Sequence, residues 1–471
     1  MKTPVCIISL LISLVSYSQK LTLNKIFASN MVLQQNAEVT LWGNADAGEG
    51  VTVITSWDNE KYKTKANDKG RWELSVNTAK AGGPYLISVS TKDTTVTLNN
   101  VLLGEVWICA GQSNMEMPLR GFMGQEVTGG NREIALSSGY KNIRIFQSRQ
   151  AKSDTLQDEP DVWHSWSVVN SKTIKDFSAA GWYFGKFLSD ALEGIPIGLI
   201  EVVWGGTPAE LWISRKTMAR FPDIGKDSVL AVSSHYGPLK PSMLFNAMVS
   251  PLTKLRFKGV IWYQGESNVK RAGKYEKIFS ALITDWREQF GFDFPFYFVQ
   301  IAPYTYYNQN SAILREAQFR VMKNMEKTGM AVTLDIGQKY RIHPAEKQKV
   351  GERLAYWALA NDYGFQGLGY TAPEYDHLEV KDSIALVYFK GEIAEATEDE
   401  LDGCFEVAGE NRVFCPARAS VGEWKDFAKV YSDKVRHPIA VRYCFRNWCK
   451  GKLFGTNELP VSSFRTDDWD E

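Results

Sequence analysis

The sequence predicts an α/β fold: a parallel sheet flanked by helices, with an N-terminal β-sandwich before it and a C-terminal β-rich region after it. Two observations support this prediction. Short β-rich runs separated by turn residues fill both ends of the chain. Between them, wholly apolar runs alternate with helix-length stretches, which is typical of strands buried on both faces of a parallel sheet. With 471 residues, 44% of them hydrophobic, the chain can build several substantial cores.

Residues 1–18 are expected to be a signal peptide rather than part of the fold. Lys2 precedes an apolar run from Val5 to Val15, and small or polar residues follow it up to Ser18. The run is shorter than the roughly 18 apolar residues that a membrane span needs, and no later stretch of the sequence reaches that length. We therefore predict a secreted or periplasmic protein without a membrane span.

Residues 19–103 are expected to form the N-terminal β-sandwich domain. β-Rich runs such as Val39–Trp42, Val51–Thr55 and Trp72–Val76 recur there at short intervals. Turn formers, including Asp68–Gly70 and Gly82–Pro84, separate these runs. This spacing is typical of sandwich strands.

Residues 104–366 are expected to form the catalytic α/β domain. Apolar runs at 106–110, 195–204, 259–263, 296–302 and 330–335 predict its strands. Helix-like stretches at 181–192, 272–290 and 344–360 predict crossover helices. In such sheets the chemistry gathers at the carboxyl ends of the strands.

Residues 367–471 return to β-rich runs, such as Leu386–Phe389 and Ile439–Tyr443, and predict a second sandwich-like region. We see no repeat or low-complexity linker between the three parts. Close packing of the domains is therefore expected.

The cysteines suggest an oxidising compartment. Of the six cysteines, Cys6 falls in the predicted signal peptide, so the remaining five include one that has no partner in the chain. The short spacings favour two disulfides, Cys404–Cys415 and Cys444–Cys449, and leave Cys109 as the odd one. A zinc site is the competing interpretation, but these spacings are not CxxC, and no metal or other cofactor is expected.

The charge balance excludes one class of partner. Lys plus Arg and Asp plus Glu number 54 each, so no positive surplus is available to hold nucleic acid or an anionic membrane. The aromatic content suits stacking on sugar rings and equally suits a β-rich core. No protein partner can be inferred from the sequence.

Ser113 is the candidate nucleophile. Only Gly111 and Gln112 separate it from the apolar run 106–110, which places it in a strand-to-helix turn. Backbone N–H groups at such a turn point outward and can stabilise an oxyanion, as acyl transfer requires. A serine in this position is more often a helix cap, so the assignment depends on the residues around it.

Four ordered blocks resemble the sialate O-acetylesterase family of the SGNH hydrolase superfamily. They are Gly111–Met115, Trp204–Trp212, Trp262–Asn268 and Ile342–Pro344. The resemblance also includes Lys25–Gln34, Phe245–Leu252 and Phe464–Trp469, and so covers nearly the whole predicted mature chain. It implies an SGNH-hydrolase-like central domain and hydrolysis of O-acetyl esters of sialic acid through a serine acyl-enzyme.

The resemblance also implies the roles of individual residues. Ser113 is the nucleophile, and its own N–H contributes to the oxyanion hole. A second backbone N–H comes from Gly205 or Gly206, where a side chain would block the approach of the substrate. A side-chain amide from Gln264 or Asn268 completes the hole, and Gln264 is preferred.

His343 is the implied base, and its orienting acid is uncertain. It takes the proton of Ser113 and returns it to the leaving sugar oxygen. Many superfamily members carry an aspartate two or three residues before this histidine, where the chain has Arg341 and Tyr340. Asp335, at the end of the preceding strand, is the candidate acid, and a backbone carbonyl behind a Ser–His dyad is the alternative.

Substrate contacts are expected from residues beside these blocks. Trp204 could form part of an apolar wall, and Glu266 could organise the site. Arg315 and Arg341 could meet a sugar carboxylate.

Two other functions stay open at this point. The same blocks would suit an esterase that deacetylates xylan or another plant polysaccharide. The unusual residues before His343 would also suit a carbohydrate-binding protein whose esterase site has decayed. In each case the expected partner is an acetylated sugar or glycan.

Overall fold

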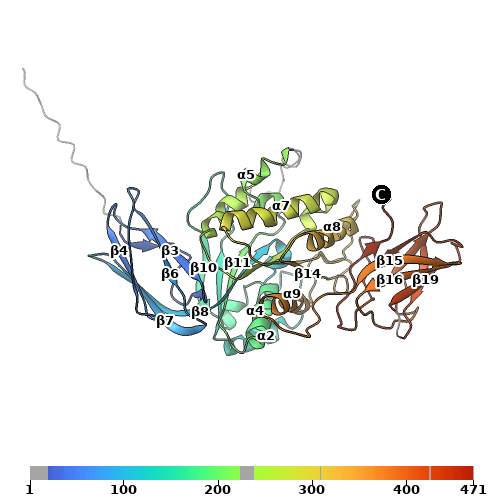
Figure 1. Cartoon of the computed structure of the whole chain (residues 1–471), viewed down its shortest axis with the longest axis horizontal. Helices are drawn as coiled ribbons and strands as arrows, with labels where there is room; N and C mark the ends of the chain where they lie inside the picture. The colour runs from blue at the N-terminus through green and yellow to red at the C-terminus, as the bar shows by residue number, and fades with distance from the viewer. Residues whose placement is uncertain (1–19, 223–237, 308, 424–425, 470–471) are drawn as a thin grey trace, which may run out of the picture.

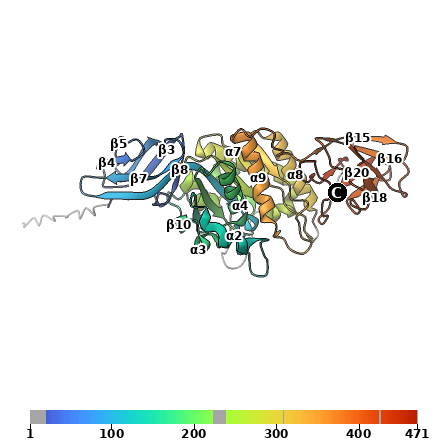
Figure 2. The ribbon, with the colours of Figure 1, turned by 90° about the horizontal axis from the view of Figure 1, so that it is seen from below.

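The computed structural model describes residues 20–222, 238–307, 309–423 and 426–469. The predicted signal peptide lies outside these residues. An N-terminal β region, a central α/β region and a C-terminal β region follow one another along the long axis of the molecule (Figure 1). Figure 2 shows the same row from below. Within the described ranges, no helix combines the length and apolar character that crossing a bilayer requires.

The N-terminal region contains two sheets that share one core. One sheet has the order β1-β3-β6, and the other joins β4, β5, β7 and β2 to the first half of β8. Alternate residues of both, such as Leu41 and Val53, are fully buried in the same hydrophobic cluster, as the alternating sequence runs require. The strands are β1 (Thr22–Leu23), β2 (Val32–Gln34), β3 (Glu38–Asn44), β4 (Gly50–Thr55), β5 (Lys61–Lys65), β6 (Arg71–Asn77), β7 (Gly82–Ser90) and β8 (Thr95–Gly111).

Strand β8 belongs to both the N-terminal and the central region. Its first half pairs with β7 in antiparallel fashion, and its second half pairs with β11 and β12 in parallel. The sequence places a domain boundary between residues 103 and 104, and that position lies inside this 17-residue strand. The chain therefore passes between the two regions without a loop.

The central region is built on a predominantly parallel sheet, which confirms the predicted α/β class. The strand order is β10-β9-β11-β8-β12-β13-β14, with β10 antiparallel to β9 and the other neighbours parallel. The additional strands are β9 (Ile143–Ser148), β10 (Val162–Val168), β11 (Ile197–Val203), β12 (Gly259–Tyr263), β13 (Phe296–Val299) and β14 (Thr328–Ala331).

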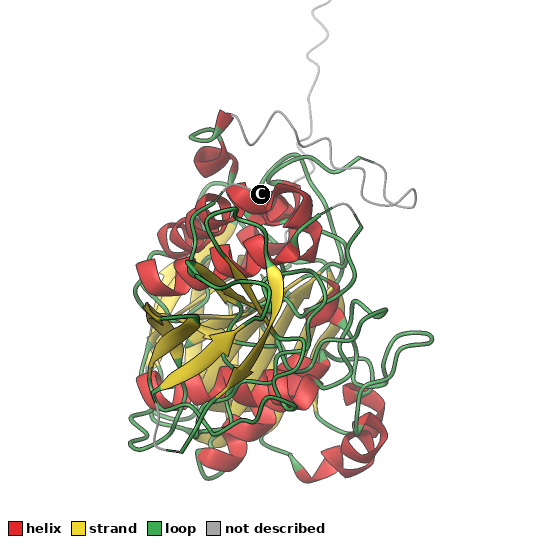
Figure 3. Cartoon of the chain, turned by 90° about the vertical axis from the view of Figure 1, so that its right-hand side faces the viewer, coloured by secondary structure: helices red, strands yellow, loops and turns green. Residues whose placement is uncertain are grey.

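Helices cover both faces of this sheet. Helices α7 and α8 lie on one face, and α4 and α9 pair on the other (Figures 1 and 3). The prediction of a helix at 272–290 is confirmed by α7, and α4 and α9 lie within a few residues of their predicted bounds. The helices are α1 (Ser113–Glu116), α2 (Gly130–Leu136), α3 (Ser171–Ile174), α4 (Ala179–Ala191), α5 (Arg215–Met218), α7 (Ala272–Phe290), α8 (Ser311–Asn324) and α9 (Lys347–Asp362). Short 3₁₀ segments form η1 (Ser137–Gly139), η2 (Ala209–Trp212), η4 (Ser250–Leu252) and η5 (Glu266–Arg271), and a π-helical segment forms η3 (Phe245–Val249).

The helices on both faces of the sheet explain why its strands are continuous apolar runs in the sequence. In β12, Val260 and Trp262 belong to the hydrophobic cluster on one face, whereas Ile261 and Tyr263 belong to the cluster on the other. All four side chains are fully buried. Both faces of the strand are therefore apolar, and the sequence shows a continuous run rather than an alternation.

The C-terminal region forms one seven-stranded sheet rather than a second sandwich of two sheets. Its order is β15-β16-β19-β18-β17-β20-β21, and all neighbours are antiparallel. The strands are β15 (Glu374–Lys381), β16 (Ile384–Lys390), β17 (Phe405–Ala408), β18 (Cys415–Ser420), β19 (Phe427–Tyr431), β20 (Ala440–Tyr443) and β21 (Phe464–Arg465).

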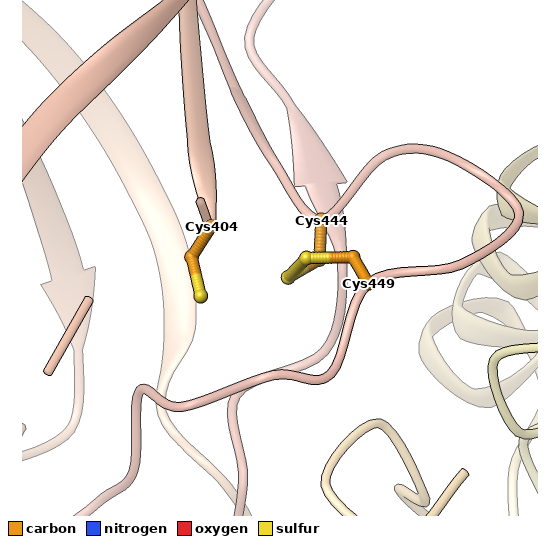
Figure 4. Close-up of side chains that lie close together, drawn as sticks. All are labelled: Cys404, Cys444 and Cys449. Atoms are coloured by element: carbon orange, nitrogen blue, oxygen red, sulfur yellow. A yellow bond between two sulfur atoms is a disulfide. The ribbon is translucent and has the colours of Figure 1, made fainter. Parts of the chain in front are cut away.

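The cysteines of this region differ in part from the prediction. Cys444 and Cys449 form the expected disulfide, but Cys404 and Cys415 are both free. Cys415 lies opposite Val407 in the sheet, whereas the backbone N–H of Cys444 donates to the carbonyl of Cys404 over 2.8 Å. Figure 4 shows the Cys404 thiol beside the disulfide, and we call Cys404, Cys444 and Cys449 the three-cysteine cluster. For Cys404 and Cys415, closeness in sequence failed as a guide, because the sheet brings Cys404 next to Cys444, which is far from it in the chain.

Candidate active site

Ser113 lies where the longest strand of the sheet gives way to a helix. Gly111 ends β8 with φ 140°, and a Cβ at this position would lie 2.2 Å from the carbonyl oxygen of Tyr263. The chain can therefore turn this tightly only with glycine. Gln112 is extended and precedes the first helical residue, Ser113. The serine side chain is thus held at the carboxyl edge of the sheet, as the sequence predicts.

His343 contacts this serine. Its Nε2 atom lies 2.9 Å from Oγ of Ser113. Its Nδ1 atom lies 2.8 Å from Oε1 of Gln125. Because an amide oxygen only accepts hydrogen bonds, Nδ1 carries the proton and Nε2 presents its lone pair to the serine hydroxyl. The ring of Phe122 packs edge-on against the imidazole at 5.2 Å between centroids.

The imidazole is neutral at physiological pH. Burial lowers the pKa of His343 to about 4, and the charge of Lys347 contributes to the decrease. A neutral imidazole can accept the proton of a serine hydroxyl, whereas an imidazolium cannot. The group is therefore in the protonation state that a general base requires.

Asn114 links three parts of the site. Its side-chain amide donates to Glu266 Oε1 over 2.5 Å and to the carbonyl of Ile342 over 3.0 Å. Its oxygen accepts a hydrogen bond of 2.6 Å from Lys347 Nζ. Burial raises the pKa of Glu266 and lowers that of Lys347 to about 7. The residue after the nucleophile thus contacts both the loop before His343 and Glu266.

The structure does not place Asp335 against His343. Its carboxylate accepts hydrogen bonds of 2.7 and 2.8 Å from the guanidinium of Arg353 in α9, and Lys349 lies 3.6 Å away. The Nδ1 atom that a triad acid would contact is occupied by Gln125. The expectation for Asp335 followed its position in the sequence, but a buried guanidinium needs a carboxylate, and Arg353 takes this one.

The amides of Gln264 and Asn268 are directed at each other. Gln264 Nε2 donates to Thr207 O over 3.2 Å and to Asn268 Oδ1 over 2.7 Å, which uses both of its hydrogens. Asn268 donates to Glu210 over 2.9 Å and accepts from the N–H of Ala209 over 3.0 Å. Both residues are fully buried. They brace the loop after β11 and do not bring an amide to the serine hydroxyl.

One glycine of that loop, Gly205, is brought to Ser113. A Cβ at Gly205 would lie 3.2 Å from Ser113 Cβ, so the glycine backbone packs directly on the nucleophile. Its N–H donates to Glu116 Oε2 over 2.5 Å. Gly206 follows in a left-handed conformation with φ 73°.

The proposed substrate residues lie deeper than expected. Trp204 is 3% exposed and Arg315 is fully buried. The guanidinium of Arg315 donates to the side chains of Ser463 and Ser311 and to the carbonyls of two residues in the C-terminal region. Arg341 pairs with Glu126 at the surface. None of these contacts leaves Arg315 able to meet a sugar in this conformation.

Sequence reasoning missed Gln125, Glu116 and Lys347. Gln125 lies in a loop between α1 and α2, where no periodic pattern or motif draws attention to it. Glu116 directly follows the first block, three residues after the nucleophile, and this closeness to Ser113 in the sequence could have drawn attention to it. Lys347 lies four residues after His343 at the start of α9. A lysine so close in sequence to a proposed base could have indicated that it belongs to the site.

Ser113, a neutral imidazole and a glycine backbone meet at the carboxyl edge of the parallel sheet, an arrangement that defines a candidate serine hydrolase. The family model described as "Carbohydrate esterase, sialic acid-specific acetylesterase" matches residues 103–360. Human sialate O-acetylesterase is 30% identical, over 89% of this chain and 86% of the human protein. The mouse sialate O-acetylesterase is 29% identical, over 89% of this chain and 88% of its own.

A solved structure agrees with this assignment. The crystal structure of a carbohydrate acetylesterase from Xanthomonas citri superimposes with a TM-score of 0.83 at 31% identity. The match covers 95% of this chain and all of that one. This chain belongs to the sialic acid-specific acetylesterase family of carbohydrate esterases, and it is a carboxylic-ester hydrolase.

Proposed function

We propose that this protein removes O-acetyl groups from carbohydrates through a Ser113 acyl-enzyme, with His343 as general base and general acid. The observation that carries the proposal is the 2.9 Å contact between Ser113 Oγ and Nε2 of a neutral imidazole. An SGNH-hydrolase-like catalytic domain at residues 104–366, between an N-terminal domain (19–103) and a C-terminal domain (367–471), is part of the proposal.

The acylation step follows from the arrangement of these two side chains. His343 Nε2 takes the proton of Ser113 Oγ while Oγ attacks the acetyl carbonyl carbon. The carbonyl oxygen gains the negative charge, and backbone N–H groups around Ser113 stabilise it. When the tetrahedral intermediate collapses, the bond to the sugar oxygen breaks, and the imidazolium gives its proton to that oxygen. The acetyl group then remains on Ser113.

Deacylation repeats the sequence with water. His343 removes a proton from a water molecule, whose oxygen attacks the acetyl-serine. The ester bond to Ser113 breaks, and the imidazolium returns its proton to Oγ. Acetic acid leaves and releases its proton to the solvent to become acetate, and the enzyme is restored.

Gln125 takes the place of the usual triad acid. Its amide oxygen fixes the Nδ1–H tautomer, which keeps the Nε2 lone pair on the serine. As a neutral group it stabilises the imidazolium less than a carboxylate does, which agrees with the low pKa of His343. The site is therefore proposed to work as a Ser–His pair with an amide behind it.

Acetylated sialic acid is the first substrate to test, because it is named in the family description and in the human relative. A specific observation favours a neutral acetylated polysaccharide, such as xylan, as the second candidate. Arg315, offered for the sugar carboxylate, is fully buried among protein acceptors, and Arg341 is paired with Glu126. Release of acetate from 9-O-acetylated sialic acid and from acetylated xylan, measured side by side, separates the two.

The location is proposed from the chain start and the cysteines. Secretion through a signal peptide at residues 1–18 would expose the C-terminal region to an oxidising compartment. The Cys444–Cys449 disulfide is consistent with that environment.

A serine replacement tests the proposed reaction. Ser113→Ala is expected to lose about 10⁴-fold or more of the turnover of p-nitrophenyl acetate, as removal of an acting nucleophile does. Ser138→Ala, at an exposed turn, is the matched control and should retain wild-type turnover. Equal turnover in the wild type and Ser113→Ala would reject the mechanism and favour a carbohydrate-binding protein with a decayed site.

A further inference from the structure

Glu116 is a carboxylate next to the nucleophile that the proton transfers do not use. It lies one helical turn after Ser113 in α1. Its Oε2 accepts the N–H of Gly205 over 2.5 Å, and its Oε1 accepts Gln150 Nε2 over 2.9 Å. Both oxygens are therefore engaged, one of them by the backbone that borders the nucleophile.

The backbone at Gly205 is fixed on several sides. The N–H of Trp204 donates to the carbonyl of Gly111 over 3.0 Å, and Thr207 Oγ1 donates to the carbonyl of Trp204 over 2.6 Å. A Cβ at Gly205 would lie 3.0 Å from Glu116 Oε2 and 3.2 Å from Ser113 Cβ. Glu116, the Gly205 backbone and Ser113 are thus packed together without space for a side chain.

This arrangement distinguishes the two glycines that the sequence left as alternatives. The N–H of Gly205 is used by Glu116, so it is not available to an oxyanion. Gly206 follows with φ 73°, a left-handed conformation that glycine adopts without strain. Within the described ranges, no protein acceptor takes the N–H of Gly206 or of Ser113.

We infer that Glu116 is a positioning residue of the oxyanion hole: by holding the Gly205 N–H, it directs the N–H of Gly206, together with that of Ser113, at the developing oxyanion. The inference rests on the proposed esterase function and adds to it. Glu116 touches neither the substrate carbonyl nor the proton in transit. It acts through the backbone of the loop after β11.

The chemistry of the contact suits this role. The role requires an oxygen that accepts the peptide N–H: a carboxylate accepts a stronger hydrogen bond than an amide oxygen does, but either oxygen can hold the N–H in place. Gln150 holds the other carboxylate oxygen, which restricts rotation of the side chain. A donor that is fixed before the reaction stabilises the oxyanion without reorganisation during it.

The expected effect lies in kcat. Removal of one oxyanion donor costs about 10²–10³ in kcat, and a donor that is present but less well directed costs less. Glu116→Ala should therefore lower kcat about 10- to 100-fold and leave KM nearly unchanged. Glu116→Gln keeps an acceptor oxygen and should recover most of this loss.

The experiment measures kcat and KM on p-nitrophenyl acetate for the full chain and its variants. Glu326→Ala, an exposed residue in the turn before β14, is the matched control. Phenylboronic acid, whose adduct with serine mimics the tetrahedral state, gives a second readout. Its affinity should fall with kcat in Glu116→Ala and return in Glu116→Gln.

Three results would overturn the inference. One is a wild-type kcat in Glu116→Ala. Another is equal loss in Glu116→Gln and Glu116→Ala, which would mean that charge rather than hydrogen-bond acceptance matters. If Glu116→Ala does not fold, Gln150→Ala replaces it. The expected result for Gln150→Ala is a loss of about 3- to 10-fold in kcat at constant KM. An unchanged kcat in Gln150→Ala is the third result that would overturn the inference. If the wild type hydrolyses no acetyl ester, the proposed function itself fails, which is a distinct outcome.

Discussion

Replacing Gln125 by glutamate tests how the neutral amide sets the properties of His343. The amide oxygen lies 2.8 Å from Nδ1, so Gln125→Glu places a carboxylate at nearly the same point without a change of length. A negative charge there stabilises the imidazolium and raises the pKa of His343. The acid limb of the pH–rate profile should therefore move to higher pH.

The size of the shift follows from the contact distance. An opposite charge within about 4–6 Å typically moves a pKa by about 1–3 units, and each unit corresponds to about 1.4 kcal/mol. From a starting pKa of about 4, the acid limb should move to about 5–7. With a new pKa of about 6, the neutral fraction of His343 at pH 5 falls about tenfold.

The sign of the effect reverses above the new pKa. There the imidazole is neutral in both proteins, but the carboxylate stabilises the imidazolium that forms in the transition state. The plateau rate at pH 8 should therefore rise about fivefold or more, since the base is better matched to the working pH. The variant loses activity in acid and gains it in mild base.

The assay is kcat/KM for p-nitrophenyl acetate from pH 4 to pH 9. Gln366→Glu, at an exposed position beyond α9, adds the same charge away from the site and should leave the acid limb near pH 4. Gln125→Ala should lower the rate at every pH without moving the limb upward. An unmoved acid limb in Gln125→Glu would refute the assigned contact.

Three further predictions concern residues around the site. Arg315→Met should lower the free energy of unfolding by about 3 kcal/mol in urea titrations, and KM for acetylated sialic acid should not change. A higher KM at unchanged stability would instead indicate that Arg315 binds the substrate. Lys347→Met removes a charge that lowers the pKa of His343, so the acid limb should move to higher pH, and a downward shift would contradict the reasoning. Cys449→Ser leaves the other two residues of the three-cysteine cluster side by side, and peptide mapping after air oxidation should find them joined; two free thiols would count against their proximity.

The sequence predicted those features of the fold that depend on local patterns of residues. Continuous apolar runs predicted five of the seven strands that the structure describes in the central sheet and missed β9 and β10. The helix-like stretch 272–290 predicted α7, which Gly291 ends in a left-handed conformation. Ser113 was found because its turn follows a strand directly. The meeting of Ser113 and His343 followed from the family resemblance, since 230 positions separate them.

The remaining features depend on contacts that no local pattern encodes. Gln125 reaches His343 across 218 positions from an irregular loop, and a glutamine there has no distinguishing neighbour. Asp335 was assigned by its place before the histidine, but Arg353, one helix later, competes for its carboxylate. Gln264 and Asn268 were assigned by chemical type, and their orientation is set by the loop they brace.

Strand β8 has a consequence for any attempt to divide the protein. Its 17 residues run from the N-terminal sheets to the turn that carries the nucleophile, with a register irregularity at Asn100, whose φ is 56°. Because this strand is paired in both regions, it joins the N-terminal sheets to the catalytic edge without a loop. A truncation that starts the chain at residue 104 would cut this strand in the middle. The N-terminal sheets are therefore better regarded as an integral part of the enzyme than as a separable domain.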